Sequence, residues 1–535
     1  MTSSFFTSSR WRTWGWVLLP VLLLFLAAWR PLALPDEGRY AEVGRWMWMT
    51  GDWLTPRLDG IPFFHKPPLL YWLEASVMAV IGASPWAARL VVAAHACVML
   101  GLMTACVRHI AGAAVAQRAA WMLGSSLAFL VGGQYVNHDM MVATWMGVAV
   151  WCFARALMHA SGVHQAWARW GFVACALGVL SKGLIGLLLP GFVLFVWVTY
   201  TWQWRKILNL PWISGLLLFA VIVLPWFVLA ARAYPDMLAY MFGKHQFGRY
   251  TATTFNNARP WWFYGLAVSV LMFPWVFVAA SDGLQRLRAL GPRRREGEHT
   301  TAVDSRWVSL CWIWVLAILG FFSIPNSKLV GYALPVMPPL AVLAALWWQT
   351  HVAPRRWAGW VFGVLVLINL GLAVGGQTAA TRYTAQRSTA DIADVLACSA
   401  RATDVVAAVD DYPYDLPFYA QLTQPLEVIQ DWATLRQTAG DNWRRELFEG
   451  ADFDAVAARS LVPLSRFDSL RHEPNAWVIA PNGSATLNAQ SHDGFTRIVE
   501  GQAWTLYRSS LAPERPKSTE QKGLRGCKQQ SQKQR

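Results

Sequence analysis

Residues 34–68 read LPDEGRYAEVGRWMWMTGDWLTPRLDGIPFFHKPP and lie between strongly apolar runs. They hold five carboxylates, four fixed cations and three Trp residues. A loop that only joins two membrane spans can be short. A loop this long and this charged, and rich in a residue that gathers at membrane surfaces, predicts a site at the membrane–water boundary.

The whole chain has the composition of a polytopic α-helical membrane protein. Of its 535 residues, 55% are hydrophobic and only 14% are charged, which excludes a soluble domain. A spanning helix needs about 20 apolar residues. We expect about 11–13 spans, because eleven runs approach that length: 15–34, 87–107, 119–137, 140–158, 169–181, 184–200, 211–231, 261–280, 307–323, 330–350 and 357–375.

The net charge of +15 is concentrated in short loops beside these runs, as is typical of cytoplasmic loops. The basic clusters lie in residues 108–118, 205–206, 286–306 and 355–356. Because they flank spans, they argue against nucleic-acid binding. All four clusters lie on the cytoplasmic side if the N-terminus is cytoplasmic and residues 67–82 do not cross the membrane. If residues 67–82 crossed, the cluster at 108–118 would move outside.

We favour the version in which residues 67–82 form a helix at the interface. Glu74 lies in the middle of this segment, and a carboxylate at mid-bilayer depth is costly. This threading gives a cytoplasmic N-terminus and an outer C-terminus. It also puts the first loop, 34–68, on the outer face.

Three domains are expected. Residues 1–375 form the transmembrane part. Residues 376–510 mix polar and apolar positions, with helices expected at 388–399 and 451–460 and strands at 405–409, 477–480 and 504–507, which indicates a small α/β domain on the outer face. Residues 511–535 are rich in Lys, Gln and Ser, which predicts a disordered basic tail.

Acidic side chains on the outer face are the candidates for catalysis. Asp36 and Glu37 could act as a general base, ligate a cation or orient sugar hydroxyls. The alternative is that they only occupy the first turn of a helix, where acids are favoured. Asp139 follows Asn137 and His138 at the outer end of two runs, and either takes part in the site or caps the next helix.

Cationic and phenolic side chains from separate loops are the candidates for binding a phosphate. The alternative for each Lys is an interfacial anchor. The strongest candidates are Lys66, which precedes two prolines, and Arg249, Lys328 and Tyr332; the weaker ones are Arg39, Arg57, His65 and Lys182. No cofactor is expected, although a divalent cation near His65 and Asp36 is a possible alternative.

Several motifs resemble those of one known family. DEGRYAE, GDWLTPRLDGIPFFHKPPLLYW, HDMM, LSKGLIGLLLPG and SIPNSKLVGYALPVMPPLA occur in order over residues 30–350. They resemble the aminoarabinose transferase branch of the GT-C glycosyltransferases, which is related to the protein O-mannosyltransferases. The resemblance implies a multispan fold with interfacial helices in the first outer loop and a periplasmic C-terminal domain.

The resemblance also implies roles for individual residues. Asp36 matches the position proposed as catalytic, Asp139 a second acidic position, and Lys66 the lysine that contacts the carrier phosphate. Arg249 and Tyr332 match other phosphate contacts. The sequence departs from the family at one place: the family usually has Glu before the lysine, as in FEKPPL, and this chain has His65.

The activity implied is transfer of a sugar from a polyprenyl phosphate, undecaprenyl phosphate in bacteria, to a periplasmic acceptor with inversion at the anomeric carbon. The acceptor expected is lipid A, which would give the protein a role in lipopolysaccharide biosynthesis at the bacterial inner membrane. The alternatives are glycosylation of a protein or another glycan, as by a mannosyltransferase, and a membrane transporter or flippase. The sugar, the acceptor and the oligomeric state stay open.

Overall fold

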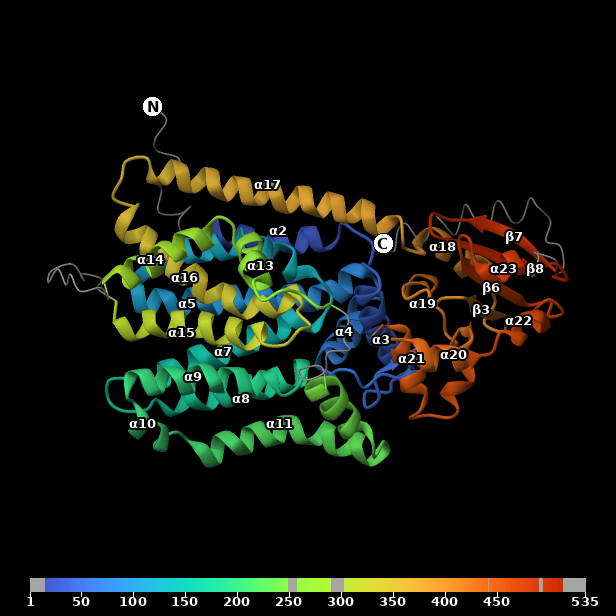
Figure 1. Cartoon of the computed structure of the whole chain (residues 1–535), viewed down its shortest axis with the longest axis horizontal. Helices are drawn as coiled ribbons and strands as arrows, with labels where there is room; N and C mark the ends of the chain where they lie inside the picture. Colours follow the sequence, from blue (N-terminus) through green and yellow to red (C-terminus); the bar gives the residue numbers. More distant parts are fainter. Residues whose placement is uncertain (1–14, 249–256, 290–302, 441, 490–493, 513–535) are drawn as a thin grey trace.

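The computed structural model describes residues 15–248, 257–289, 303–440, 442–489 and 494–512. Two parts are visible in Figure 1: a bundle of long helices and a domain built on a β-sheet at one end of the bundle. Helices α3 (Asp36–Thr50) and α4 (Leu69–Ile81) lie where the two parts meet. The tail predicted at 511–535 lies almost wholly outside the described residues.

Each of the eleven apolar runs is helical in the bundle. Six described helices are long and apolar enough to cross a membrane: α5 (Pro85–Gly124), α7 (His138–Leu157), α11 (Trp212–Ala233), α15 (Ser305–Ser323), η4 (Val330–Val336) continued by α16 (Met337–His351), and α17 (Ala358–Ala385). The remaining runs form α2 (Leu18–Ala27), α6 (Leu127–Leu130), α8 (Gln165–Lys182), α9 (Ile185–Thr201), α13 (Phe263–Leu271) and α14 (Trp275–Ala289). The expected multispan helical fold is therefore confirmed.

Two helices meet within α5. Gly112 has φ 83° and ψ 172°, values outside the helical region that glycine adopts without strain. After this turn the chain runs back along the bundle. A close contact shows this direction: a Cβ atom on Gly133 would lie 3.0 Å from the Cβ of Ala96. The predicted run 87–107 lies in the first helix of α5, whereas the run 119–137 covers the end of the second helix, α6 and the short η2 (Gly132–Gln134). The basic cluster at 108–118 flanks the turn at Gly112.

Helix α4 is too short to cross a bilayer. It has 13 residues, whereas a span needs about 20. It packs against α3, and Glu74 lies at the contact, where a Cβ atom on Gly44 would meet its side chain. Glu74 is fully buried and neither of its carboxylate oxygens has a hydrogen-bond partner within the described part of the chain. The short length agrees with a segment that does not cross, and Glu74 faces protein rather than the interface.

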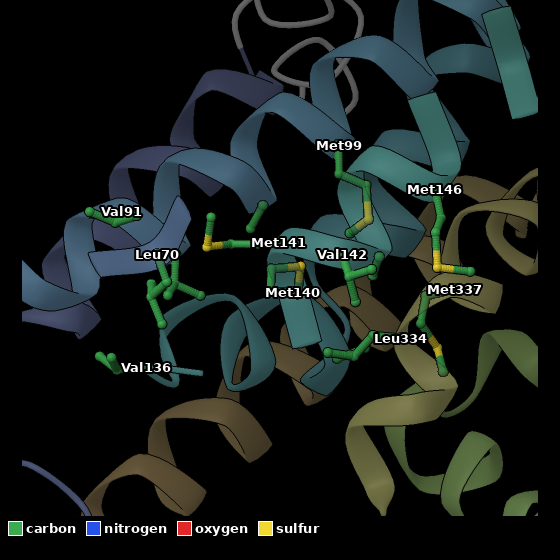
Figure 2. Packing of buried hydrophobic residues seen from close by; sticks show 14 of the residues in the cluster. Leu70, Val91, Met99, Val136, Met140, Met141, Val142, Met146, Leu334 and Met337 are labelled. Carbon is green, nitrogen blue, oxygen red and sulfur yellow. The ribbon is translucent and has the colours of Figure 1, made fainter. Parts of the chain in front are cut away.

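The core of the bundle centres on α7. Figure 2 shows four apolar side chains of this helix packed against residues of α5, α4, η4 and α16: Met140, Met141, Val142 and Met146 against Leu70, Val91, Met99, Leu334 and Met337. Methionine fills irregular gaps between helices because it is unbranched and flexible. This packing fixes the first turn of α7, which carries His138 and Asp139.

The C-terminal domain contains a six-stranded sheet with strand order β5-β4-β3-β6-β8-β7. The strands are β3 (Val405–Val409), β4 (Glu427–Ile429), β5 (Leu461–Val462), β6 (Ala476–Pro481), β7 (Phe495–Glu500) and β8 (Trp504–Ser509). Strands β5, β4, β3 and β6 are parallel, whereas β8 is antiparallel to both β6 and β7. Its helices are α18 (Ala390–Ser399), α19 (Leu416–Ala420), α20 (Trp432–Thr438), α21 (Arg444–Ala451), η5 (Ala457–Ser460), α22 (Ser465–Leu470) and α23 (Ala485–Ala489).

The sequence predicted the buried strands of this sheet better than its helices. The strands expected at 405–409, 477–480 and 504–507 coincide with or lie within β3, β6 and β8. The helix expected at 388–399 is α18, but the helix expected at 451–460 was wrong. Helix α21 ends at Ala451 and only the short η5 follows.

The first loop is held between the bundle and the C-terminal domain. Arg45 of α3 donates to the carbonyl oxygen of Leu422 at 2.7 Å. Asp59 lies between the short strands β1 (Arg57–Leu58) and β2 (Ile61–Pro62) and accepts from the backbone of Leu426 at 2.8 Å. The first loop and the C-terminal domain are therefore joined by directional contacts.

The described basic loops lie away from this junction. Figure 1 shows α10 (Trp204–Leu208), which carries Arg205 and Lys206, at the end of the bundle far from the sheet. The connection between α16 and α17, which holds Arg355 and Arg356, lies at the same end.

Candidate active site

The site begins at the first turn of α3, where Asp36 and Glu37 follow Pro35. Acidic side chains are favoured there because the helix dipole is positive at its N-terminus. Adjacent positions on a helix point in different directions. The two carboxylates consequently have different surroundings.

Glu37 is fully buried and its hydrogen-bonding capacity is used by the protein. It is ion-paired with Arg30 and with Arg89, the latter at 2.9 Å, and it accepts from the backbone nitrogens of Ala33 and Val136. Burial alone would raise its pKa, but Arg30 and Arg89 lower the pKa of Glu37 to about 2. These contacts join α3, α5 and the segment between α2 and α3, so Glu37 holds these parts of the chain together.

Asp36 is the more accessible carboxylate, with its side chain 39% exposed. Its Oδ1 accepts from Arg39 at 2.6 Å, and its Oδ2 accepts from the hydroxyl of Tyr135 at 3.2 Å. The carboxylate is thus fixed on both oxygens while it remains open to an incoming group.

Arg39 connects Asp36 to the C-terminal domain. Its guanidinium also forms an ion pair with Glu446 of α21. Glu446 lies 3.6 Å from Nδ1 of His65, so a carboxylate stands beside the position where this chain departs from the family's Glu. Burial raises the pKa of Glu446, while Arg39 and Lys66 act to lower it.

A second carboxylate of α21 extends this network. The hydroxyl of Tyr240, in η3 (Ala239–Gly248), lies 2.7 Å from Nε2 of His65 and 3.0 Å from Glu449. Glu449 also accepts from Lys244 at 2.8 Å. Three segments far apart in the sequence, the first loop, η3 and α21, therefore meet through His65.

Lys66 shares these surroundings. It is half-buried, and it acts electrostatically on both Glu446 and His138. His138 is also within electrostatic range of Lys182 and Arg39. The structure therefore brings Lys66 into the region between α3 and the start of α7.

Asp139 forms a second cluster beside the first. The ammonium of Lys182, at the end of α8, is bonded to the Asp139 carboxylate and lies 4.5 Å from the ring centroid of Tyr332. Asn137 caps α7 and donates to Asp139 at 3.1 Å. The turn therefore caps α7, as one of the two alternatives predicted, and Asp139 also forms a buried ion pair.

Two other candidates, Lys328 and Arg57, have partners within the protein. Lys328 is 3% exposed and donates to the carbonyl oxygens of Pro325 and Arg259, at 2.6 and 3.1 Å. Arg57 is bonded to Gly60, Tyr234 and Asp454. Both therefore hold loops in place rather than facing Asp36. Arg249 lies outside the described residues.

The residues near Asp36 do not resemble a metal centre. Within the described ranges, His, Cys, Asp and Glu nowhere form a group of three or more that could hold an ion. His65 instead contacts Tyr240 and Glu446, as given above, and it stacks on Phe63 with ring centroids 4.7 Å apart.

Sequence reasoning missed Tyr135, Tyr240, Glu446 and Glu449. Tyr135 lies just before the Asn137-His138-Asp139 motif, so its neighbourhood was a usable signal. No signal in the sequence pointed to the two glutamates, Glu446 and Glu449. They belong to a short amphipathic helix that looks like any surface helix, and they lie about 400 residues from α3 in the sequence.

Known proteins match large parts of the chain in sequence. Residues 65–228 match the family model of the dolichyl-phosphate-mannose-protein mannosyltransferases. An undecaprenyl phosphate-α-4-amino-4-deoxy-L-arabinose arabinosyl transferase of Sodalis glossinidius is 32% identical over 59% of this chain and 55% of its own length. A transferase of the same name from Pseudomonas aeruginosa strain UCBPP-PA14 is 29% identical over 63% of this chain and 59% of its own length. The chain thus spans little more than half the length of these relatives.

The fold has a solved counterpart. ArnT from Cupriavidus metallidurans bound to undecaprenyl phosphate is 24% identical, with a TM-score of 0.78 over 94% of this chain and 100% of that one. The apo form of the same protein gives a TM-score of 0.75.

The chain is therefore a multi-pass membrane protein with the GT-C glycosyltransferase fold. Within that class it is similar to the undecaprenyl phosphate-aminoarabinose arabinosyl transferases, and the resemblance drawn from its motifs is confirmed.

Proposed function

We propose that the chain is an integral membrane glycosyltransferase that moves a sugar from undecaprenyl phosphate to lipid A. Two findings support this function. Its curated relatives are named as transferases of aminoarabinose from undecaprenyl phosphate, and the ArnT structure that shares its fold holds undecaprenyl phosphate.

The proposed orientation has the N-terminus in the cytoplasm and the active site and the C-terminal domain in the periplasm. Support comes from the distribution of positive charge, since Lys and Arg are retained on the cytoplasmic side. The described basic loops at α10 and between α16 and α17 lie at the end of the bundle opposite the sheet domain (Figure 1).

The observation that carries the proposal is the arrangement of Asp36. It is an accessible carboxylate held on one side by Arg39 and on the other by Tyr135, in a region that also contains Lys66. Such an arrangement can accept a proton or orient an acceptor without itself moving.

The reaction is a single displacement at the anomeric carbon. The acceptor oxygen forms the new bond as the bond between the sugar and the carrier phosphate breaks, and the electron pair leaves with undecaprenyl phosphate. Asp36 takes the proton if the acceptor is a hydroxyl, and it orients the acceptor if that group is already an anionic phosphate.

The phosphate that leaves gains negative charge, and cations aimed at it lower the barrier. Lys66 supplies this charge in the proposal, and Lys182 contributes while bonded to Asp139. Removing one such donor typically raises the barrier by about 3 kcal/mol. Lys328 is assigned no such role, because its ammonium donates to two backbone carbonyls.

The test uses the purified full chain in liposomes with undecaprenyl-phosphate aminoarabinose and lipid A. Mass spectrometry should detect lipid A heavier by one sugar residue, in amounts that depend on the protein. The control is Asp468→Asn, since Asp468 lies on α22 far from the site and is 65% exposed. Sugar-lipid that crosses the liposome membrane without forming a product would indicate a transporter instead.

A second acceptor class has support of its own. The family model that matches residues 65–228 is that of protein mannosyltransferases, so a protein hydroxyl is the alternative acceptor. Mass spectrometry of lipid A and of surface glycoproteins from a deletion strain separates the two, because only the true product loses its sugar.

A further inference from the structure

Helix α21 brings two carboxylates of the C-terminal domain to the site. Glu446 and Glu449 lie one turn apart on α21, at a spacing that places both on the same face. Glu446 contacts Arg39 and His65, and Glu449 contacts Tyr240 and Lys244. Both carboxylates therefore point toward the transmembrane part rather than toward solvent.

The contact made by Glu446 is largely shielded from water. Its side chain is 15% exposed, and that of Arg39 is 8% exposed. A buried ion pair adds little net stability, because the cost of removing the charges from water offsets their attraction. Apolar packing would attach the domain equally well, so docking alone does not explain why charges are used here.

The geometry of Arg39 gives a reason. One terminal nitrogen of its guanidinium bonds Glu446 and the other bonds Asp36. The planar group is a rigid fork, so fixing one end fixes the direction of the other. A displacement of Glu446 would therefore be passed to the carboxylate of Asp36.

We propose that Glu446 is a positioning residue of the transfer site, supplied by the C-terminal domain, which orients Asp36 through Arg39 and holds His65 beside Lys66. This inference rests on the proposed function. It means that the transmembrane part alone holds an incomplete site, and that α21 completes it.

The experiment measures kcat, KM for the sugar-lipid donor and Tm for the full chain and its variants. Glu446→Gln keeps the size of the side chain and removes its charge. We expect kcat per folded molecule to fall about tenfold or more, with KM within about threefold of wild type, as for loss of an interaction that matters mainly in the transition state. Tm should fall as well, because Arg39 loses one of its two carboxylate partners, so each kcat is normalised to folded protein. Glu446→Asp, which keeps the charge, should recover part of the lost kcat.

Two controls separate positioning from docking. Asp454→Asn removes the contact with Arg57, which joins the same two parts without reaching Asp36, and should leave kcat unchanged. In an Arg39→Lys background, Glu446→Gln should lower kcat by no more than about twofold further, because both changes break the same connection.

The outcomes are distinct. Wild-type kcat in Glu446→Gln, or a loss equal to that in Asp454→Asn, or full additivity with Arg39→Lys, would overturn the inference while the proposed function stands. A wild-type chain that transfers no sugar would overturn the proposed function, and the inference with it.

Discussion

Lys182 and Asp139 form an ion pair between the end of α8 and the first turn of α7. Both side chains are about nine-tenths buried, and the Lys182 ammonium also lies over the ring of Tyr332. This pair joins three parts of the bundle at the edge of the proposed site.

Removing one member of the pair should destabilise the protein. In Lys182→Met the Asp139 carboxylate keeps its burial but loses its cation, which typically costs about 3 kcal/mol. We expect a clear fall in the Tm measured in detergent. The double variant Lys182→Met/Asp139→Asn should recover most of it. A double variant no more stable than Lys182→Met would show that the pair is not coupled.

Tyr135 should affect catalysis more than stability. Tyr135→Phe removes the hydroxyl that donates to Oδ2 of Asp36 and keeps the ring. A hydrogen bond to a charged group is worth about 1.5–3 kcal/mol, so kcat should fall about tenfold or more. Tyr383→Phe is the matched control, because Tyr383 is an exposed residue on α17. Equal kcat in both variants would count against the assigned role.

Substitution of Glu37 should mainly affect stability, whereas substitution of its neighbour Asp36 should mainly affect catalysis. Glu37→Gln is expected to lower Tm strongly, with nearly normal kcat per folded molecule, because Arg30 and Arg89 lose their common partner. The pKa of Glu37 falls from 4.5 to about 2 on folding. Its contribution to stability is therefore present above pH 4.5 and is lost as the pH falls toward 2. A Glu37→Gln variant with normal Tm and no activity would reverse the assignment.

The contribution of Asp59 to stability should have the opposite pH dependence to that of Glu37. Burial raises its pKa from 3.8 to about 8, although the backbone of Leu426 donates to it. The folded state thus favours the protonated acid, and stability is lost as the pH rises from about 4 through 8.

Asp59→Asn should therefore raise Tm at pH 8 and flatten the dependence of Tm on pH. Asn keeps an acceptor for Leu426 and tolerates the positive φ of 55° at this position. Thermal unfolding at pH 5–9 tests this expectation, with Asp468→Asn as the exposed control. Parallel Tm curves for Asp59→Asn and wild type would contradict it.

Much of the bundle could be predicted from the sequence, because a span must be long and apolar whatever its neighbours are. All eleven runs contain helix, and α4 is shorter than a span requires. Residues 169–181 are the weakest of these runs, yet they form most of α8, which packs closely on α7. Burial against other helices here replaces contact with lipid.

The roles of individual charges were harder to predict. A lysine in an outer loop has the same local sequence whether it faces a ligand, a carboxylate or a backbone carbonyl. Lys182 proved to face Asp139, and Lys328 proved to face two carbonyls. Glu37 and Asp36 are adjacent, and only the tertiary positions of Arg30 and Arg89 distinguish them. The position of Glu446 beside Arg39 depends on how the C-terminal domain docks on the bundle. No local sequence pattern indicates this docking.

The most direct test of the central claim compares kcat for sugar transfer from undecaprenyl phosphate in wild type, Asp36→Asn and Lys66→Ala, each normalised to folded protein. We predict that both variants lose at least about a hundredfold in kcat, in line with the loss of a group that acts in the transition state, while Asp468→Asn matches wild type. Transfer at the wild-type rate by Asp36→Asn and Lys66→Ala would contradict it.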